Sequence, residues 1–158
     1  MGAASDLMGG AMDDGSADRS AQVEEVTAEL RAWADGRIDV QAVALVGSYA
    51  REPGAATAES DVDIVVVTSK VSDYLESTDG FPATLELPPL RAKQWGVVHE
   101  RRLRHRETGL AVELNFTTPE WAATTPEVDS GTKKVVLDGI RVLRDPHGLL
   151  ARLIDACR

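Results

Sequence analysis

Residues 45–68 read Leu-Val-Gly-Ser-Tyr-Ala-Arg-Glu-Pro-Gly-Ala-Ala-Thr-Ala-Glu-Ser-Asp-Val-Asp-Ile-Val-Val-Val-Thr, and this stretch decides the fold. An apolar run ends at Gly47–Ser48, and a second apolar run opens with Asp61 and Asp63 on either side of a valine. Successive side chains of a strand alternate between its two faces, so both aspartates point to one face and the valine points to the other. The stretch therefore predicts a strand, a turn with a short helix, and a second strand that begins with two carboxylates.

The two aspartates place two negative charges on one face, with no basic residue between them. Such carboxylates repel each other unless a cation lies between them, and oxygen ligands favour magnesium or manganese over zinc. Gly47 allows the backbone to approach a ligand closely, and a helix that starts near Ser48 would direct free N–H groups at an anion. A divalent metal site beside an anion-binding turn is therefore expected.

This arrangement resembles the signature of the DNA polymerase beta-like nucleotidyltransferase superfamily, and most closely its small single-domain members, the minimal nucleotidyltransferases. The core motif covers residues 47–63, and a looser resemblance extends to about Leu150. The resemblance implies an α/β (α+β) domain with a mixed β-sheet and helices packed mainly on one face. Small members often read Gly-Ser-x-Ala-Arg-Gly, whereas Glu52 replaces the last glycine here and places an acid beside the expected phosphate site.

The resemblance also implies a reaction: metal-dependent transfer of a nucleoside monophosphate, AMP from ATP, to an acceptor hydroxyl. By this resemblance two Mg²⁺ ions, or Mn²⁺, are held by Asp61, Asp63 and Glu113. Glu113 would complete the site of the acceptor-side ion and act as the general base. The residues expected to bind the nucleotide phosphates are Gly47, Ser48 and Arg51.

Glu113 also emerges from the pattern of its own strand. The run 110–117 alternates, with leucine, valine, leucine and phenylalanine on one face and Ala111, Glu113 and Asn115 on the other. If this strand shares a sheet with the Asp61 strand, their apolar faces must lie on the same side, and Glu113 then lies on the carboxylate side. The alternative is that Glu113 is an ordinary solvated strand residue.

Composition indicates a single domain. The chain has 158 residues, with 43% apolar and 27% charged residues, which is typical of a globular protein. Residues 1–18 are rich in small and polar residues without a period, so we expect a disordered tail, followed by one nucleotidyltransferase-like domain over residues 19–158. Met8 and Met12 are alternative starts to Met1.

The remaining elements follow from hydrophobic periodicity and turn residues. A helix is expected from Ser20 to about Asp35, and a hairpin is expected from two runs joined near Gly109. The other expected elements are a strand over 41–46, a long loop over 79–89, hairpin strands over 97–106 and 110–117, a helix over 129–137, a strand over 140–143 and a helix over 146–156.

Charge and cysteine content limit the partners and the compartment. The net charge of −9 argues against a protein that grips long nucleic acid. Cys157 is the single cysteine, so a disulfide framework is excluded and a reducing, cytoplasmic setting is expected. No apolar run approaches the roughly 20 residues that span a bilayer, and the N-terminus lacks the pattern of a secretory signal. No membrane partner is expected.

One segment has the opposite charge to the rest of the chain. Residues 91–106 contain six basic residues and a single acid, Glu100, for a net charge of +5, so the other residues sum to −14. In a strand Arg102, Arg104 and Arg106 share one face. Two interpretations are equally compatible with this pattern: an edge strand protected from aggregation by charge, or a positive rim that guides the triphosphate or an acidic partner.

The acceptor is left open by the sequence. Acceptors known in the superfamily that suit a small enzyme include small molecules, such as aminoglycoside or lincosamide antibiotics, and protein side chains. A second hypothesis, also implied by the resemblance, is an antitoxin that binds a helical HEPN-type toxin, with or without catalysis. A third hypothesis is a metal-binding domain without catalysis.

Overall fold

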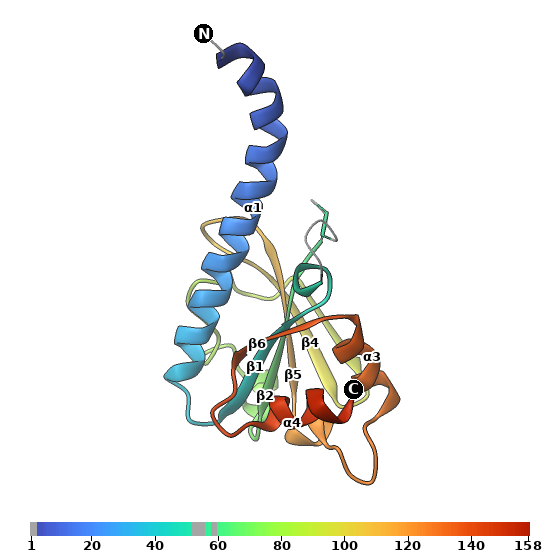
Figure 1. Ribbon diagram of the computed structural model, residues 1–158. Helices are drawn as coiled ribbons and strands as arrows, with labels where there is room; N and C mark the ends of the chain where they lie inside the picture. The colour runs from blue at the N-terminus through green and yellow to red at the C-terminus, as the bar shows by residue number, and fades with distance from the viewer. Residues whose placement is uncertain (1–2, 52–55, 58–59) are drawn as a thin grey trace.

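A six-stranded mixed sheet in the order β3-β4-β5-β2-β1-β6 forms the centre of the structure (Figure 1). Strands β2 and β5 are parallel, and the other neighbours are antiparallel. The strands are β1 (Val40–Val46), β2 (Val62–Thr68), β3 (Arg91–Trp95), β4 (Val98–Arg104), β5 (Ala111–Thr117) and β6 (Ile140–Arg144). The α+β fold with a mixed sheet, which the sequence predicts, is confirmed.

The computed structural model describes residues 3–51, 56–57 and 60–158, and for residues 3–17 it describes the backbone alone. The predicted departure at Glu52 and the expected end of the first short helix at Pro53 therefore lie outside the described residues. The helices are α1 (Ala3–Asp35), α2 (Val71–Glu76), α3 (Ser130–Asp138) and α4 (Leu149–Ala156), with two short 3-10 helices, η1 (Ser48–Ala50) and η2 (Pro119–Ala122).

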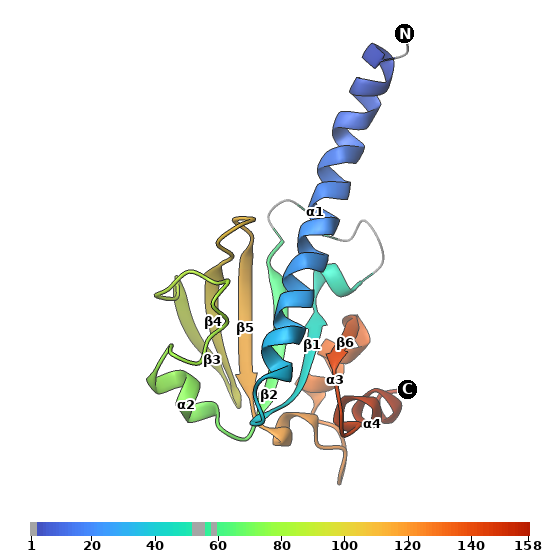
Figure 2. The ribbon, with the colours of Figure 1, turned by 90° about the vertical axis from the view of Figure 1, so that its left-hand side faces the viewer.

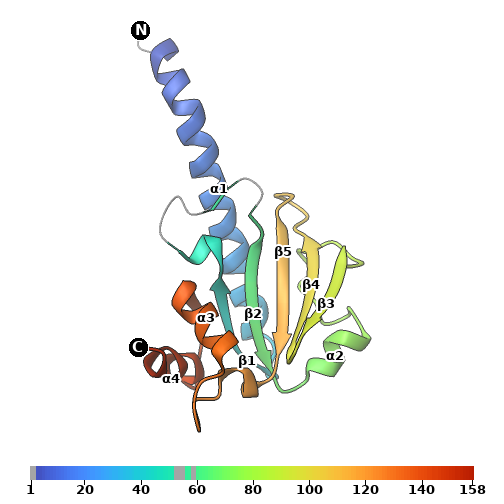
Figure 3. The same ribbon diagram turned by 90° about the vertical axis from the view of Figure 1, so that its right-hand side faces the viewer.

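Helices cover parts of both faces of the sheet. The long helix α1 and the short α2 pack on one face, while η2, α3 and α4 pack on the other, beside β1 and β2 (Figures 2 and 3). The sequence analysis placed the helices mainly on one face. The second group exists because β1 is apolar on both sides: Val43 and Leu45 enter one core, whereas Ala42 and Ala44 enter the other.

The larger core lies between the sheet and α1. Leu30 of α1 and Ile64, Leu114 and Phe116 of the central strands are at most 1% exposed there. The apolar face predicted for the 110–117 run is therefore the buried one. Because this face packs against α1, the opposite face of β5, which carries Glu113, is turned away from the larger core.

Two elements differ from the sequence analysis. Helix α1 begins at Ala3, so Ser20 lies inside it rather than capping its start, because the alanines that precede Ser20 are strong helix formers. The separate domain boundary near residue 19 stays a prediction. Strand β3 was not predicted; it pairs with β4 across a turn at Gly96, whose φ of +59° favours glycine.

The other predicted elements are confirmed within one to three residues. The hairpin of β4 and β5 forms with Gly109 in its turn at φ +76°, and α3 is capped by Asp129, whose side chain accepts a hydrogen bond from the Thr132 N–H. None of the helices in the described part of the chain combines the length and the apolar character that a membrane crossing requires.

The boundary near residue 19 can be tested by truncation. The first buried side chain described in α1 is Val23, so deletion of residues 1–18 should change the free energy of unfolding by less than about 1 kcal/mol. Leu30→Ala, a matched change inside the core, should lower it by about 2–5 kcal/mol. Urea denaturation of the three proteins measures both effects. A truncation as destabilising as Leu30→Ala would show that the first 18 residues belong to the domain.

Candidate active site

One row of paired residues crosses five strands of the sheet. Val46 of β1 pairs with Asp63 of β2, Asp63 pairs with Glu113 of β5, Glu113 pairs with Arg102 of β4, and Arg102 pairs with Arg91 of β3. The register that brings Glu113 beside Asp63 is the one that the sequence predicts. In Figure 3 this face is turned to the viewer, with α3 and α4 beside β1 and no helix in front of β5 and β4.

Gly47 follows the first member of this row directly. Its φ of +75° and ψ of −154° lie in a region that other residues rarely adopt. A Cβ atom at this position would lie 2.9 Å from Asp63 Oδ2. The turn therefore needs glycine for two reasons, and it brings the backbone of the predicted phosphate-binding turn into contact with a predicted metal ligand. The short helix η1 begins at Ser48, where the sequence predicts it.

The three predicted acids converge. The carboxyl group of Glu113 is hydrogen-bonded with those of Asp63 and Asp61. Burial, together with these contacts, raises the pKa of Glu113 to about 9. Burial also raises the pKa of Asp63, which the hydrogen bond from Glu113 opposes. Glu113 is therefore the group that keeps a proton at neutral pH and donates it to Asp63.

Two arginines that the sequence analysis did not assign to the site bind these acids. Arg102 Nη2 donates to Asp61 Oδ1 at 3.0 Å, and Arg91 Nη2 donates to Glu113 Oε2 at 2.9 Å. Arg91 also binds Glu100 Oε2 at 2.6 Å. Arg91 opposes the raised pKa of Glu113, but its guanidinium is partly exposed and shared with Glu100, so burial of Glu113 prevails.

The signal for Arg102 was present in the sequence. When β4 and β5 form a hairpin, one face of β4 lies on the same side of the sheet as Glu113, and Arg102 is on that face. The hairpin itself is predicted from the sequence. The signal for Arg91 is weaker because residues 91–95 lie between the predicted loop over 79–89 and the predicted hairpin, where the sequence predicts no element. Glu100, which is buried and also accepts from Trp95 Nε1 at 3.2 Å, is a fourth acid on this face.

Arg51 is not joined to the carboxylates. The residue is exposed, and a Cβ atom added to Gly139 would lie 3.0 Å from Arg51 Cγ, so the Arg51 stem lies against the start of β6. In the described residues no ion pair links it to Asp61 or Asp63. Its predicted role at the phosphates requires a different rotamer or a ligand within its reach.

The donor set fits a hard divalent cation. Asp61, Asp63 and Glu113 offer carboxylate oxygens alone, which magnesium and manganese prefer. The proton on Glu113 and the guanidinium on Asp61 supply the positive charge that such an ion would otherwise provide. A second, separate group of possible metal ligands is formed by Glu25, Glu29 and His105, whose ligand atoms lie within 4.8 Å of one another.

That second group has a full set of hydrogen bonds around its histidine. His105 is buried; its Nδ1 accepts from the Thr108 N–H at 3.1 Å, so its Nε2 carries the proton and donates to Glu29 Oε1 at 2.6 Å. Glu29 belongs to α1 and His105 follows β4, so the pair ties the long helix to the β4–β5 turn. The group could hold a metal, and its hydrogen bonds also explain it as a structural link.

Comparison with known families gives one match. The model of the family described as nucleotidyltransferase domain matches residues 26–112, which is more than half of the chain. The matched region begins inside α1, includes Gly47, Asp61 and Asp63, and ends one residue before Glu113. A comparison with curated proteins found no match.

The requirement for glycine at position 47 gives a prediction. Gly47→Ala should lower the free energy of unfolding by about 1–3 kcal/mol, because alanine is strained at this φ and ψ and its Cβ would contact Asp63. Gly36→Ala is the matched control, since its Cβ would meet its nearest atom at an ordinary 3.6 Å. Thermal and urea unfolding of both variants measure the difference. Equal stabilities would contradict the close approach of Gly47 to Asp63.

The protonated state of Glu113 gives a second prediction. Its folded-state pKa of about 9 lies above the ordinary 4.5, so its contribution to stability is complete below pH 4.5 and is lost as pH rises toward 9. Glu113→Gln keeps an acceptor for Arg91 and a donor for Asp63 without the titration. In a chelating buffer at pH 8 it should be more stable than the original protein by about 1 kcal/mol or more.

Urea denaturation between pH 5 and pH 9 tests this expectation. The advantage of Glu113→Gln should grow with pH over this range. Glu107→Gln removes a carboxylate from the exposed β4–β5 turn and serves as the control that should show no such trend. A constant difference between Glu113→Gln and the original protein across the range would contradict a proton held on Glu113.

Proposed function

This chain belongs to the nucleotidyltransferase domain family, and we propose that it transfers a nucleoside monophosphate, preferentially AMP from ATP, to an acceptor hydroxyl. The observation that carries the proposal is the row across the sheet, which sets Gly47 against Asp63 and Asp63 against Glu113. This row supports a triphosphate held at one end of a group of carboxylates. The proposed setting is the cytoplasm, where ATP is available and Cys157 stays reduced.

Asp61, Asp63 and Glu113 would hold two divalent cations, with Mg²⁺ as the first candidate and Mn²⁺ as a substitute. When bound, such ions neutralise the triphosphate and lower the pKa of the acceptor hydroxyl. Asp63 suits the position between them because it neighbours both the turn at Gly47 and the carboxyl of Glu113. Asp61 would exchange the guanidinium of Arg102 for a cation.

The phosphates would lie at the turn after β1. The backbone N–H groups of Gly47 and Ser48 and the Ser48 hydroxyl are the proposed donors to the β- and γ-phosphates. Arg51 follows η1 directly, and its exposed side chain is long enough to turn from Gly139 toward the same phosphates.

The reaction proposed is a single in-line displacement. The acceptor oxygen attacks the α-phosphorus, the bond between the α-phosphorus and the oxygen that bridges to the β-phosphorus breaks, and pyrophosphate leaves. Cations at this site would displace the proton that Glu113 keeps in their absence, and the Glu113 carboxylate would then accept the proton of the acceptor hydroxyl. The products are the nucleotidylated acceptor and pyrophosphate.

A partner-binding role, as the antitoxin of a HEPN-type toxin with or without catalysis, is the second candidate. One observation favours it: apolar side chains are exposed along the β3 edge and the loop before it. These side chains are Leu87, Leu90, Trp95 and Val97, each at least 42% exposed. Scattered exposed apolar residues are common, but a group at a sheet edge is typical of an interaction surface.

Labelling with nucleotide tests the proposed function. The protein is incubated with Mg²⁺ and α-labelled ATP in a cell extract, beside Asp63→Asn, which should lower transfer at least about a hundredfold because it removes a cation ligand. Asp73→Asn, an exposed change on α2, is the control that should keep full activity. Unlabelled GTP, CTP and UTP as competitors measure the preference for ATP.

The fate of the label separates the candidates. Label on a small molecule supports a small acceptor, and label on a protein supports protein adenylylation of the kind that an active antitoxin would perform. Loss of label in Asp63→Asn is required in both cases. No transfer from any of the four nucleoside triphosphates would contradict the catalytic proposal and leave the partner-binding candidate.

A further inference from the structure

We propose that Arg91 and Arg102 form an anion-binding site on the acceptor side of the carboxylates, and that the acceptor is a small hydroxyl compound with a phosphate or carboxylate group. This inference rests on the proposed function and names the class of its acceptor. It begins from the contacts of the two arginines, whose side chains are 37% and 34% exposed and therefore reachable from solvent.

The arginines and the cations need the same oxygens. Arg102 binds Asp61 Oδ1 and Arg91 binds Glu113 Oε2, and both acids are proposed cation ligands. A guanidinium that stays within a few ångströms of a divalent cation is repelled strongly at the effective dielectric of a protein surface. Cation binding therefore releases Arg102 from Asp61, while Arg91 keeps its second partner, Glu100, at 2.6 Å.

The strand order places both arginines on the opposite side of the acids from the proposed phosphate position. The turn at Gly47 lies at the end of β1, the acids lie on β2 and β5, and the arginines lie beyond them on β4 and β3. In an in-line displacement the attacking oxygen and the leaving pyrophosphate lie on opposite sides of the α-phosphorus. Pyrophosphate at Gly47 therefore requires the acceptor to approach over β5, β4 and β3, the strands left open in Figure 3.

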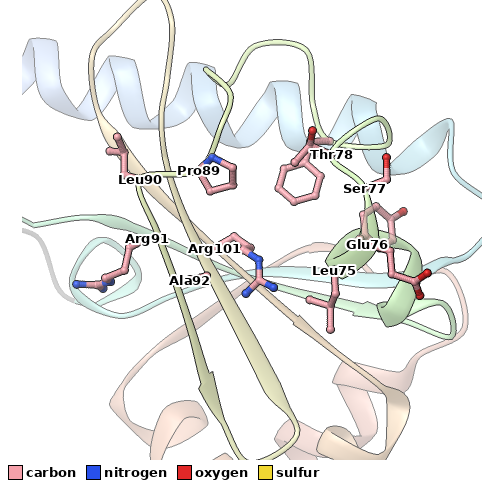
Figure 4. A pocket seen from close by; sticks show the side chains of 11 residues that line it. Leu75, Glu76, Ser77, Thr78, Pro89, Leu90, Arg91, Ala92 and Arg101 are labelled. Carbon is pink, nitrogen blue, oxygen red and sulfur yellow. The ribbon is translucent and has the colours of Figure 1, made fainter.

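Other basic residues divide between the two faces. Lys93 pairs with Glu100 in the next row and adds positive charge to the acceptor side. Arg101 belongs to the opposite face, where it lines a pocket between α2 and the β3–β4 hairpin (Figure 4). Arg91 also lines this pocket, but its guanidinium binds Glu100 and Glu113. The acceptor side thus carries Arg91, Lys93, Arg102 and Arg104. Arg104 donates to the Gly109 carbonyl, whereas Arg102 would lose its partner if a cation took Asp61.

This arrangement selects a compact anion. The guanidinium fork matches the oxygens of a phosphate or carboxylate, and a cationic acceptor would be repelled. A long polyanion is disfavoured because the chain outside residues 91–106 carries a net charge of −14. A single anionic group on a small molecule satisfies both conditions.

The first measurement is the affinity of the nucleotide-free protein for Mn²⁺. The electron paramagnetic resonance signal of free Mn²⁺ reports how much of the ion remains unbound. Arg102→Gln removes the group that competes for Asp61, so Mn²⁺ should bind roughly tenfold more tightly. Arg104→Gln is the matched control: it removes the same charge from the same face of β4, but its partner is the Gly109 carbonyl. An Mn²⁺ affinity in Arg102→Gln equal to that of the original protein would overturn the competition.

The second measurement uses three probes that differ in charge: glycerol, glycerol 3-phosphate and glycerate. Saturation-transfer nuclear magnetic resonance measures their binding to the protein with Mg²⁺ and α,β-methylene-ATP. We expect binding of an anionic probe but not of glycerol, and the comparison of phosphate with carboxylate identifies the preferred group. Arg102→Gln should weaken that binding at least roughly tenfold, Arg102→Lys should weaken it less, and Arg104→Gln should not change it.

Binding of the nucleotide analogue is measured separately in the same sample and tests the proposed function. If the analogue binds and all three probes behave alike, or if Arg102→Gln binds the anionic probe as well as the original protein does, the anion site is wrong and the proposed function stands. If the analogue itself does not bind, both proposals fail. Equal melting temperatures for Arg102→Gln and Arg102→Lys establish that any loss of binding is not a loss of folding.

Discussion

Repulsion among three carboxyl groups, of which Glu113 is buried and Asp61 and Asp63 are half-buried, is the constraint to which this part of the structure responds. Asp61, Asp63 and Glu113 meet on one face of the sheet, where burial disfavours the charged forms of Asp63 and Glu113 and raises the pKa of both. The metal-free protein relieves this repulsion in two ways. Glu113 keeps its proton, and guanidinium groups from β3 and β4 bind two of the acids. Stability is therefore given up at the proposed cation site.

The topology explains why those guanidinium groups lie beside the acids. Strands β2 and β5 are parallel, so the chain must cross over between Thr68 and Ala111, and it does so through α2, a loop and the β3–β4 hairpin. Strand β4 then pairs with β5 on its free side, which places Arg102 opposite Glu113. The parallel pairing that joins the two acids thus also determines which strand lies beside them.

The sequence predicts the central row because that row depends on alternation. A slip of one residue in β5 would turn Glu113 into the apolar core and Leu114 out of it, so the register follows from hydrophobicity alone. Strand β3 could not be found in this way: its residues are basic or polar apart from Ala92 and Trp95, and its conformation depends on pairing with β4, which is a tertiary effect. The early start of α1 reflects local alanine content instead, a signal that the glycines in the same stretch obscured.

The basic segment over residues 91–106 shows that the role of a charged segment depends on which side chains its residues contact in the structure. An edge strand protected by charge and a positive rim were equivalent interpretations of residues 91–106. Strand β3 is an edge strand, and Arg91 within it binds Glu100 and Glu113, so one residue takes part in both arrangements. A charge that only protected an edge would point to solvent, whereas Arg91 and Arg102 point across the sheet to acids. The acids therefore set the positions of both arginines. If cations took those acids, as we propose, an anionic group on the acceptor would be the partner that balances the charge of the arginines.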